Sequence, residues 1–146
     1  MFPFYCIDCI INGRDNRCMK HTYKARKIIK TIGLNYRKNS FNIHVLELLT
    51  KTSRQQLHEI ITSNYGLSPK KIITYLRLED SFELFANNNL NIYEISKRIG
   101  FTSLRNFRKV FISEFKITPT EFREEIFQKN NFSLEVYKLL YNMWLR

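Results

Sequence analysis

The chain has 146 residues, 44% of them apolar and 14% aromatic, which is enough to build a hydrophobic core and excludes a wholly disordered chain. Lysine and arginine number 24 against 13 aspartate and glutamate residues, and the resulting net charge of +11 predicts an anionic partner. Only 4 glycines and 3 prolines are present, which favours helices over a turn-rich β-sandwich, and the chain lacks the run of about 18 apolar residues that a membrane-spanning helix needs.

Residues 1–21 hold all three cysteines of the chain, which occur with a histidine at the spacing of zinc ligands. The ligands would be Cys6, Cys9, Cys18 and His21. We predict a structural zinc site, because two such pairs can wrap a tetrahedral ion and four protein ligands leave no open position for catalysis. Incidental cysteines and a redox role are the alternatives. Because the cysteine count is odd and no basic leader precedes the apolar start, we expect no disulfide framework and no secretory signal.

A first helix-turn-helix subdomain is predicted over residues 22–68. It opens with a helix expected at 23–36, and Ser53 is placed to cap the helix that follows the turn. Lys51 occupies the place in the turn where glycine is favoured, which costs stability if this residue adopts a positive φ. A single linker helix is predicted over residues 69–86. About 16 of its residues at 1.5 Å each span roughly 24 Å, and such a helix could hold two recognition helices about one DNA turn apart.

A second helix-turn-helix subdomain is predicted over residues 87–129. Asn91 and Glu94 have the spacing of a capping box, and Gly100 stands where a helix commonly ends in a left-handed residue. Ser103 can cap the next helix, whose apolar residues recur at helical spacing. The order of short helix, glycine-containing turn and second helix is typical of the helix-turn-helix motif.

The two subdomains are copies of one unit. When the sequence is shifted by 50 residues, identical or similar residues coincide over about 25 positions, which indicates the same supersecondary structure in each half. The coinciding pairs include Val45 with Ile95, Leu49 with Ile99, Ser53 with Ser103, Leu57 with Phe107, Ile61 with Phe111 and Pro69 with Pro119. We therefore predict an all-α fold of two helix-turn-helix subdomains joined by a linker helix, with a short Cys/His segment at the N-terminus.

Three runs of the second copy follow one another in order: Ile95 to Ser103, Phe107 to Phe111 and Phe115 to Arg123. Together they resemble the signature of the AraC/XylS transcription regulators, and the resemblance extends over about residues 22–125. It implies that both subdomains enter adjacent major grooves on one face of DNA. Since the chain is too short for an effector or dimerisation domain of its own, it is similar to the small stand-alone members, which bind asymmetric sites as monomers.

The outer faces of the two recognition helices are the predicted DNA contacts. On the second helix the candidates are Ser103, Leu104, Arg105, Asn106, Arg108 and Lys109, and on the first they are Ser53, Arg54, Gln55, His58 and Glu59. Arginine and lysine can donate to guanine, asparagine and glutamine can pair with adenine, and glutamate can accept from the amino group of cytosine. Glu59 departs from the family pattern, in which this position often carries a basic or polar base reader.

We therefore predict a sequence-specific transcription regulator, an activator, located in the cytoplasm at the nucleoid. No Ser-His-Asp order, glycine-rich phosphate loop or HExxH motif is present, so no enzymatic activity is expected. Double-stranded DNA is the expected partner, with RNA polymerase as a further one and no membrane. The chain is expected to bind DNA as a monomer.

Residues 130–146 are expected to form an amphipathic helix that either packs on the core or serves dimerisation or a polymerase contact. Two alternative functions stay open at this point. One is a metal- or redox-responsive regulator that senses through the cysteine cluster, and the other is a basic protein-interaction module.

Overall fold

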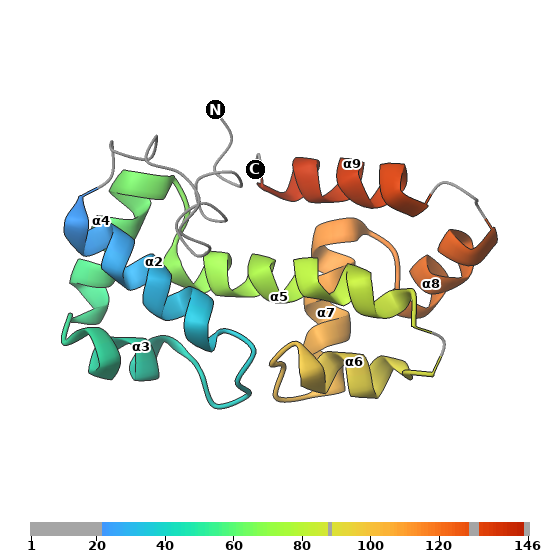
Figure 1. Cartoon of the computed structure of the whole chain (residues 1–146), viewed down its shortest axis with the longest axis horizontal. Coiled ribbons are helices and arrows are strands. Elements are labelled where there is room, and N and C mark those ends of the chain that lie inside the picture. Colours follow the sequence, from blue (N-terminus) through green and yellow to red (C-terminus); the bar gives the residue numbers. More distant parts are fainter. Residues whose placement is uncertain (1–21, 88, 129–131, 145–146) are drawn as a thin grey trace. The chain divides into compact units, whose positions relative to one another are not determined.

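The structure is a computed structural model that describes residues 22–87, 89–128 and 132–144 (Figure 1). This part of the chain contains eight helices and no strand, which confirms the all-α prediction for it. The chain divides into two compact units, residues 1–74 and residues 75–146. None of the helices in the described ranges is long and apolar enough to cross a membrane. The predicted zinc segment, residues 1–21, lies outside the described residues.

The first unit is a small helical bundle. It contains α2 (Tyr23–Asn35), α3 (Ile43–Thr50), α4 (Arg54–Tyr65) and the start of α5 (Pro69–Phe85). α2 packs against both α3 and α4, and the fully buried side chains of these three helices are Ala25, Ile28, Ile29, Ile32, Leu46, Leu57 and Ile61. The backbone N–H of Thr22 donates to Oδ1 of Asn64 at 3.0 Å, which ties the start of α2 to the last turn of α4.

The second unit is built around a cluster of phenylalanine rings. It contains the remainder of α5, then α6 (Ile92–Arg98), α7 (Leu104–Phe115), α8 (Pro119–Gln128) and α9 (Phe132–Trp144). Phe111 of α7 lies at the centre, with its ring centroid 5.6 Å from those of Phe85, Phe107 and Phe122. Burial of each such side chain stabilises the unit by about 1.5–3 kcal/mol, so α7 is held in place mainly by its apolar face.

The predicted repeat is confirmed from the recognition helices onward. α4 and α7 each have 12 residues, begin after Ser53 and Ser103, and end at a left-handed residue, Gly66 (φ 74°) and Lys116 (φ 62°). The next helices begin at Pro69 and Pro119. Every one of these positions differs by the offset of 50 residues.

Upstream of the turn the predicted register is wrong, because the offset there is 49. The caps of α3 and α6 are Asn42 and Asn91, and the buried residue that matches Ile95 is Leu46 rather than Val45. Leu49, which was paired with the buried Ile99, is 53% exposed.

A difference in turn length accounts for this shift. Three residues separate α3 from α4, whereas five separate α6 from α7, and α3 is one residue longer than α6, so the net shift is one residue. The shorter turn places Lys51 in the left-handed region at φ 50°, a conformation that costs a non-glycine residue about 1 kcal/mol. The longer turn places Gly100 there, at φ 94°, without that cost.

The C-terminal helix packs through the residues at its end. Met143 and Trp144 of α9 are buried, and the Trp144 ring stands edge-on to Tyr75, with 5.2 Å between ring centroids. Tyr75 in turn donates from its hydroxyl to Oε2 of Glu114 on α7, at 3.4 Å. α9 therefore rests on its own unit through these contacts, as the packing alternative predicted.

Candidate nucleic-acid interface

The side chains of the cap residue Ser53 and of Glu47 on α3 fix the start of α4. Oγ of Ser53 accepts a hydrogen bond from the N–H of Gln56 at 3.3 Å, and Oε1 of Glu47 accepts one from the N–H of Arg54 at 2.7 Å. Both N–H groups belong to the first turn of a helix, where no backbone carbonyl can reach them. Because Glu47 lies on α3, its carboxylate also joins the two helices of the motif across the turn.

The start of α7 is fixed in a related way. Oγ of Ser103 accepts from the N–H of Asn106 at 3.2 Å. In the preceding turn, Nζ of Lys97 donates to the carbonyl of Thr102 at 2.6 Å, and the N–H of Phe101 donates to the carbonyl of Ser96 at 3.0 Å. These bonds run from α6 into the turn and thus set the direction in which α7 leaves it.

Neither Glu47 nor Lys97 was among the residues predicted from the sequence. The sequence feature that could have predicted them is a charged side chain near the end of the first helix of each motif. Such a side chain can reach backbone groups that the turn and the next helix leave unsatisfied.

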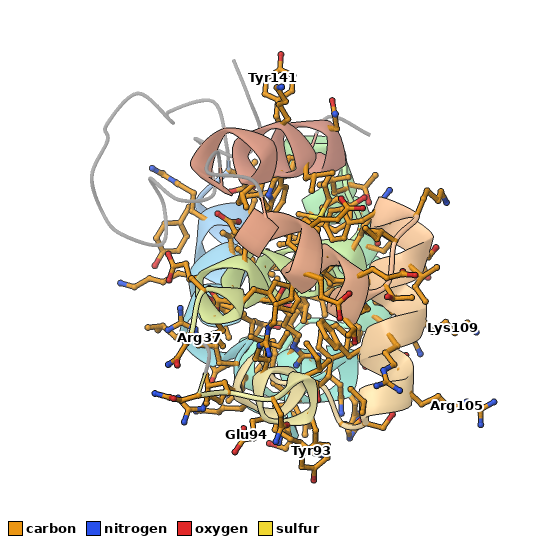
Figure 2. The ribbon with its side chains drawn as sticks, turned by 90° about the vertical axis from the view of Figure 1, so that its right-hand side faces the viewer. Arg37, Tyr93, Glu94, Arg105, Lys109 and Tyr141 are labelled. Carbon is orange, nitrogen blue, oxygen red and sulfur yellow. The ribbon has the colours of Figure 1, made fainter. Side chains whose placement is uncertain are left out.

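The inner face of each recognition helix determines which residues point outward. Leu57 and Ile61 of α4, like Phe107 and Phe111 of α7, are fully buried. Ten of the eleven predicted contact residues are exposed, and the remaining one, Leu104, is half-buried. Figure 2 shows Arg105 and Lys109 extending outward from α7 on the same side of the helix. The predicted contact residues of each unit therefore share one outward face.

The first turns of α4 and α7 lack acidic residues, in contrast to those of α6 and α8. Glu94 stands in the first turn of α6 and Glu121 in that of α8, whereas α4 opens on Arg54 and α7 carries Arg105 as its second residue. A helix N-terminus bears partial positive charge, so an acid there stabilises by about 0.3–1 kcal/mol and a cation does not. The two recognition helices thus present added positive charge at the end that favours an anion.

The central outer face of α4 differs chemically from that of α7. Nε2 of Gln55 donates to Oε1 of Glu59 at 3.0 Å, one turn further along the helix. This bond occupies an amide donor and leaves the amide carbonyl and the carboxylate as acceptors. The outer face of α7 instead carries the donors Arg105, Arg108 and Lys109. At these central positions α4 therefore presents more acceptors and α7 more donors, while Arg54 and His58 add donors elsewhere on the outer face of α4.

The four predicted zinc ligands, Cys6, Cys9, Cys18 and His21, lie outside the described residues. Within residues 22–87, 89–128 and 132–144, no three histidine, cysteine, aspartate or glutamate side chains are grouped to hold a metal ion.

Residues 49–125 match the sequence model of the family described as "Helix-turn-helix domain". Over 90 residues the chain is 28% identical to the RCS-specific HTH-type transcriptional activator RclR of Escherichia coli (strain K12). This alignment covers 62% of this chain and 32% of that protein. Over 100 residues it is 29% identical to the Lactose operon transcription activator of Staphylococcus xylosus, and this alignment covers 68% of this chain and 35% of that protein. The chain thus spans about a third of the length of these curated relatives.

A solved structure has the same fold. The C-terminal domain of the two-component response regulator yesN from Fusobacterium nucleatum superposes with a TM-score of 0.65 at 24% sequence identity. The superposition covers 70% of this chain and 99% of that domain.

Proposed function

The chain belongs to the AraC-type helix-turn-helix family, and on that premise we propose that it is a sequence-specific transcription regulator that reads double-stranded DNA with α4 and α7. The observation that carries the proposal is the same in both units. Each recognition helix buries one apolar face and turns a polar face outward from a first turn that carries a cation and no acid. A helix of this kind fits the major groove, where its N-terminal residues reach base edges.

The two helices are expected to read different bases. The donors of α7 suit the O6 and N7 acceptors of guanine. The acceptors that Gln55 and Glu59 present on α4 suit the amino groups of adenine and cytosine. An operator for this chain would therefore combine a guanine-containing half with a half that displays amino groups in the major groove. The two halves would differ in sequence, in keeping with binding as a monomer to an asymmetric site.

Activation is the expected direction of regulation, because two of the relatives are named transcription activators. RNA polymerase is then a further expected partner. The zinc site at Cys6, Cys9, Cys18 and His21 stays part of the proposal on the strength of its ligand spacing, with the structural role of holding the N-terminal segment together.

The test is a binding selection on random duplexes, followed by affinity measurements on the selected site and on single-base variants of it. Arg105→Ala is expected to weaken binding by about 1–3 kcal/mol and to relax the base preference at one position. Lys30→Ala on α2 is the matched control, since it removes one exposed cation from another helix. Uniform weakening across all base variants by Arg105→Ala would contradict the base-reading role.

The salt dependence of binding provides a second test. Two helices seated in grooves neutralise several phosphates, so the logarithm of affinity should fall with the logarithm of salt concentration with a slope of magnitude well above about two. A slope below that value would count against the mode in which both units contact DNA.

A further inference from the structure

The exposed face of α2 carries cations between two large apolar side chains. Tyr23, Lys27, Lys30 and Leu34 follow one another at helical spacing on the side opposite the buried residues of α2, and we call these four residues the α2 outer face. Tyr23 is 77% and Leu34 is 69% exposed. α2 contains two further exposed cations and no acidic residue.

The α2 outer face and the outer face of α4 lie on different sides of the first unit. α2 packs against α3 and α4 through a stripe of alanine and isoleucine side chains, and α4 contributes Leu57 and Ile61 to the same core. Because the buried faces of the two helices meet there, their exposed faces point away from each other. A duplex seated on the outer face of α4 therefore leaves the α2 outer face open.

We propose that the α2 outer face is a docking surface for an acidic protein segment. Charge complementarity requires an acidic occupant, because α2 carries four cations and no acid. Tyr23 and Leu34 stand about 16 Å apart along the helix axis, three turns, so the occupant is an acidic segment of similar length with an apolar side chain near each end. The family model matches from residue 49 onward and does not include this helix.

The positions of the apolar side chains favour protein over the other anionic partners. Nucleic acid would use the cations through its phosphates and leave Tyr23 and Leu34 exposed. A membrane surface is bound by a continuous apolar face that inserts into the lipid, whereas here Lys27 and Lys30 separate the two apolar residues.

The probe for this surface is a synthetic helical peptide with glutamates along one face and a leucine at each end of that face. Binding would be followed on the isotope-labelled full chain by chemical-shift changes, which are expected to centre on the α2 outer face. Lys27→Glu combined with Lys30→Glu should weaken peptide binding by about tenfold, since exposed pairs contribute little singly and reversal replaces attraction with repulsion. Lys24→Glu combined with Lys70→Glu is the matched control, because it changes the net charge equally and leaves the α2 outer face intact.

The apolar requirement and the two other partners are tested with the same proteins. Replacing both peptide leucines by serine should weaken binding, and so should Leu34→Ser in the protein. Affinity for a random-sequence duplex should fall equally in the two charge variants, as bulk charge alone requires. These outcomes are independent of the Arg105→Ala experiment, which tests base reading by another helix.

Three results would overturn the proposal. The first is a peptide affinity that is the same in both charge variants, or that does not depend on the leucines. The second is a selective loss of duplex affinity in the Lys27/Lys30 variant, which would make α2 a DNA contact. The third is binding of phosphatidylserine vesicles through α2 together with no binding of the peptide, which would assign the face to a lipid surface.

Discussion

Replacing Trp144 by alanine is expected to destabilise the second unit by about 3–5 kcal/mol. The indole is only 3% exposed and packs edge-on against Tyr75. A buried tryptophan removes about 150–250 Å² from water, which is worth about 4–6 kcal/mol at most, and the last turn of a helix can relax to recover part of the loss. A unit of about 70 residues has a total stability of about 4–10 kcal/mol, so the variant should retain a folded second unit only marginally.

Tyr141→Ala on the same helix is the control, because this side chain is 41% exposed (Figure 2). Its effect should be clearly smaller than that of Trp144→Ala, because less of the side chain is removed from water. Urea unfolding followed by far-ultraviolet circular dichroism measures both variants. Trp144 is the only tryptophan, so the fluorescence of the unchanged chain gives an independent check: its emission should shift to longer wavelength on unfolding. Equal midpoints for the two variants, or emission already at the wavelength of exposed indole in the folded chain, would refute the packing of α9.

Three further predictions concern the turn, a helix cap and the N-terminal segment. Lys51→Gly should raise the free energy of unfolding by about 0.5–1 kcal/mol in a urea titration, because it removes the left-handed strain at φ 50°; an unchanged or lower midpoint would show that no strain is stored there. Hydrogen bonds from the side-chain hydroxyl and backbone N–H of Thr118 lower the pKa of Glu121. The stabilisation of α8 by this cap is therefore fully present at pH values above the pKa of Glu121 in the unfolded chain, and it is lost as the pH falls through the lower pKa of the folded chain. Thr118→Ala should raise the Glu121 pKa toward its ordinary value in an NMR titration, and an unmoved titration curve would contradict the assignment. Purified protein should carry about one zinc ion per chain by elemental analysis, and Cys6→Ser combined with Cys9→Ser should abolish it; zinc content equal in the two proteins would remove the site.

The recognition helices could be predicted from the sequence because several local signals agree there. Ser53 and Ser103 cap the helices, and Leu57 and Phe107 begin their apolar faces at the same distance from the cap. Because the cap position and the apolar spacing agree, only one placement of each helix along the sequence buries its apolar face. The outward residues then follow, since the inner face determines them.

The register of α3 could not be predicted in the same way. Val45, Leu46, Leu48 and Leu49 offer apolar side chains at almost every position, so an offset of 49 and one of 50 both pair apolar with apolar residues. The structure buries Leu46 and exposes Leu48 and Leu49, because α3 is one residue longer than α6 and the turn that follows it is two residues shorter, which shifts the register by one residue. Turn length depends on the φ angle that Lys51 adopts, and no periodicity in the flanking helix contains that information.

The finer chemistry of the interface depends on contacts that spacing alone does not select. Gln55 has the spacing to reach Glu59, but an exposed glutamine has several partners within reach, and the bond that forms is one choice among them. Glu47 reaches the N–H of Arg54 only because the turn brings the two helices together. The docking of Trp144 on Tyr75 joins residues almost seventy positions apart, which no local pattern specifies.

The first turns of α4 and α7 differ in charge from those of α6 and α8. α6 and α8 follow the electrostatic preference of a helix, with Glu94 and Glu121 in their first turns. α4 and α7 forgo that stabilisation, about 0.3–1 kcal/mol each, and carry Arg54 and Arg105 instead. The first turns of α3 and α5 also lack an acid, so this absence alone does not distinguish the recognition helices; α4 and α7 share a serine cap followed by an exposed arginine in the first turn. In the proposed mode of binding, a phosphate or a base edge rich in acceptors would supply the negative charge that these helix starts lack, so the gain that is absent in the free protein would be recovered when DNA is bound.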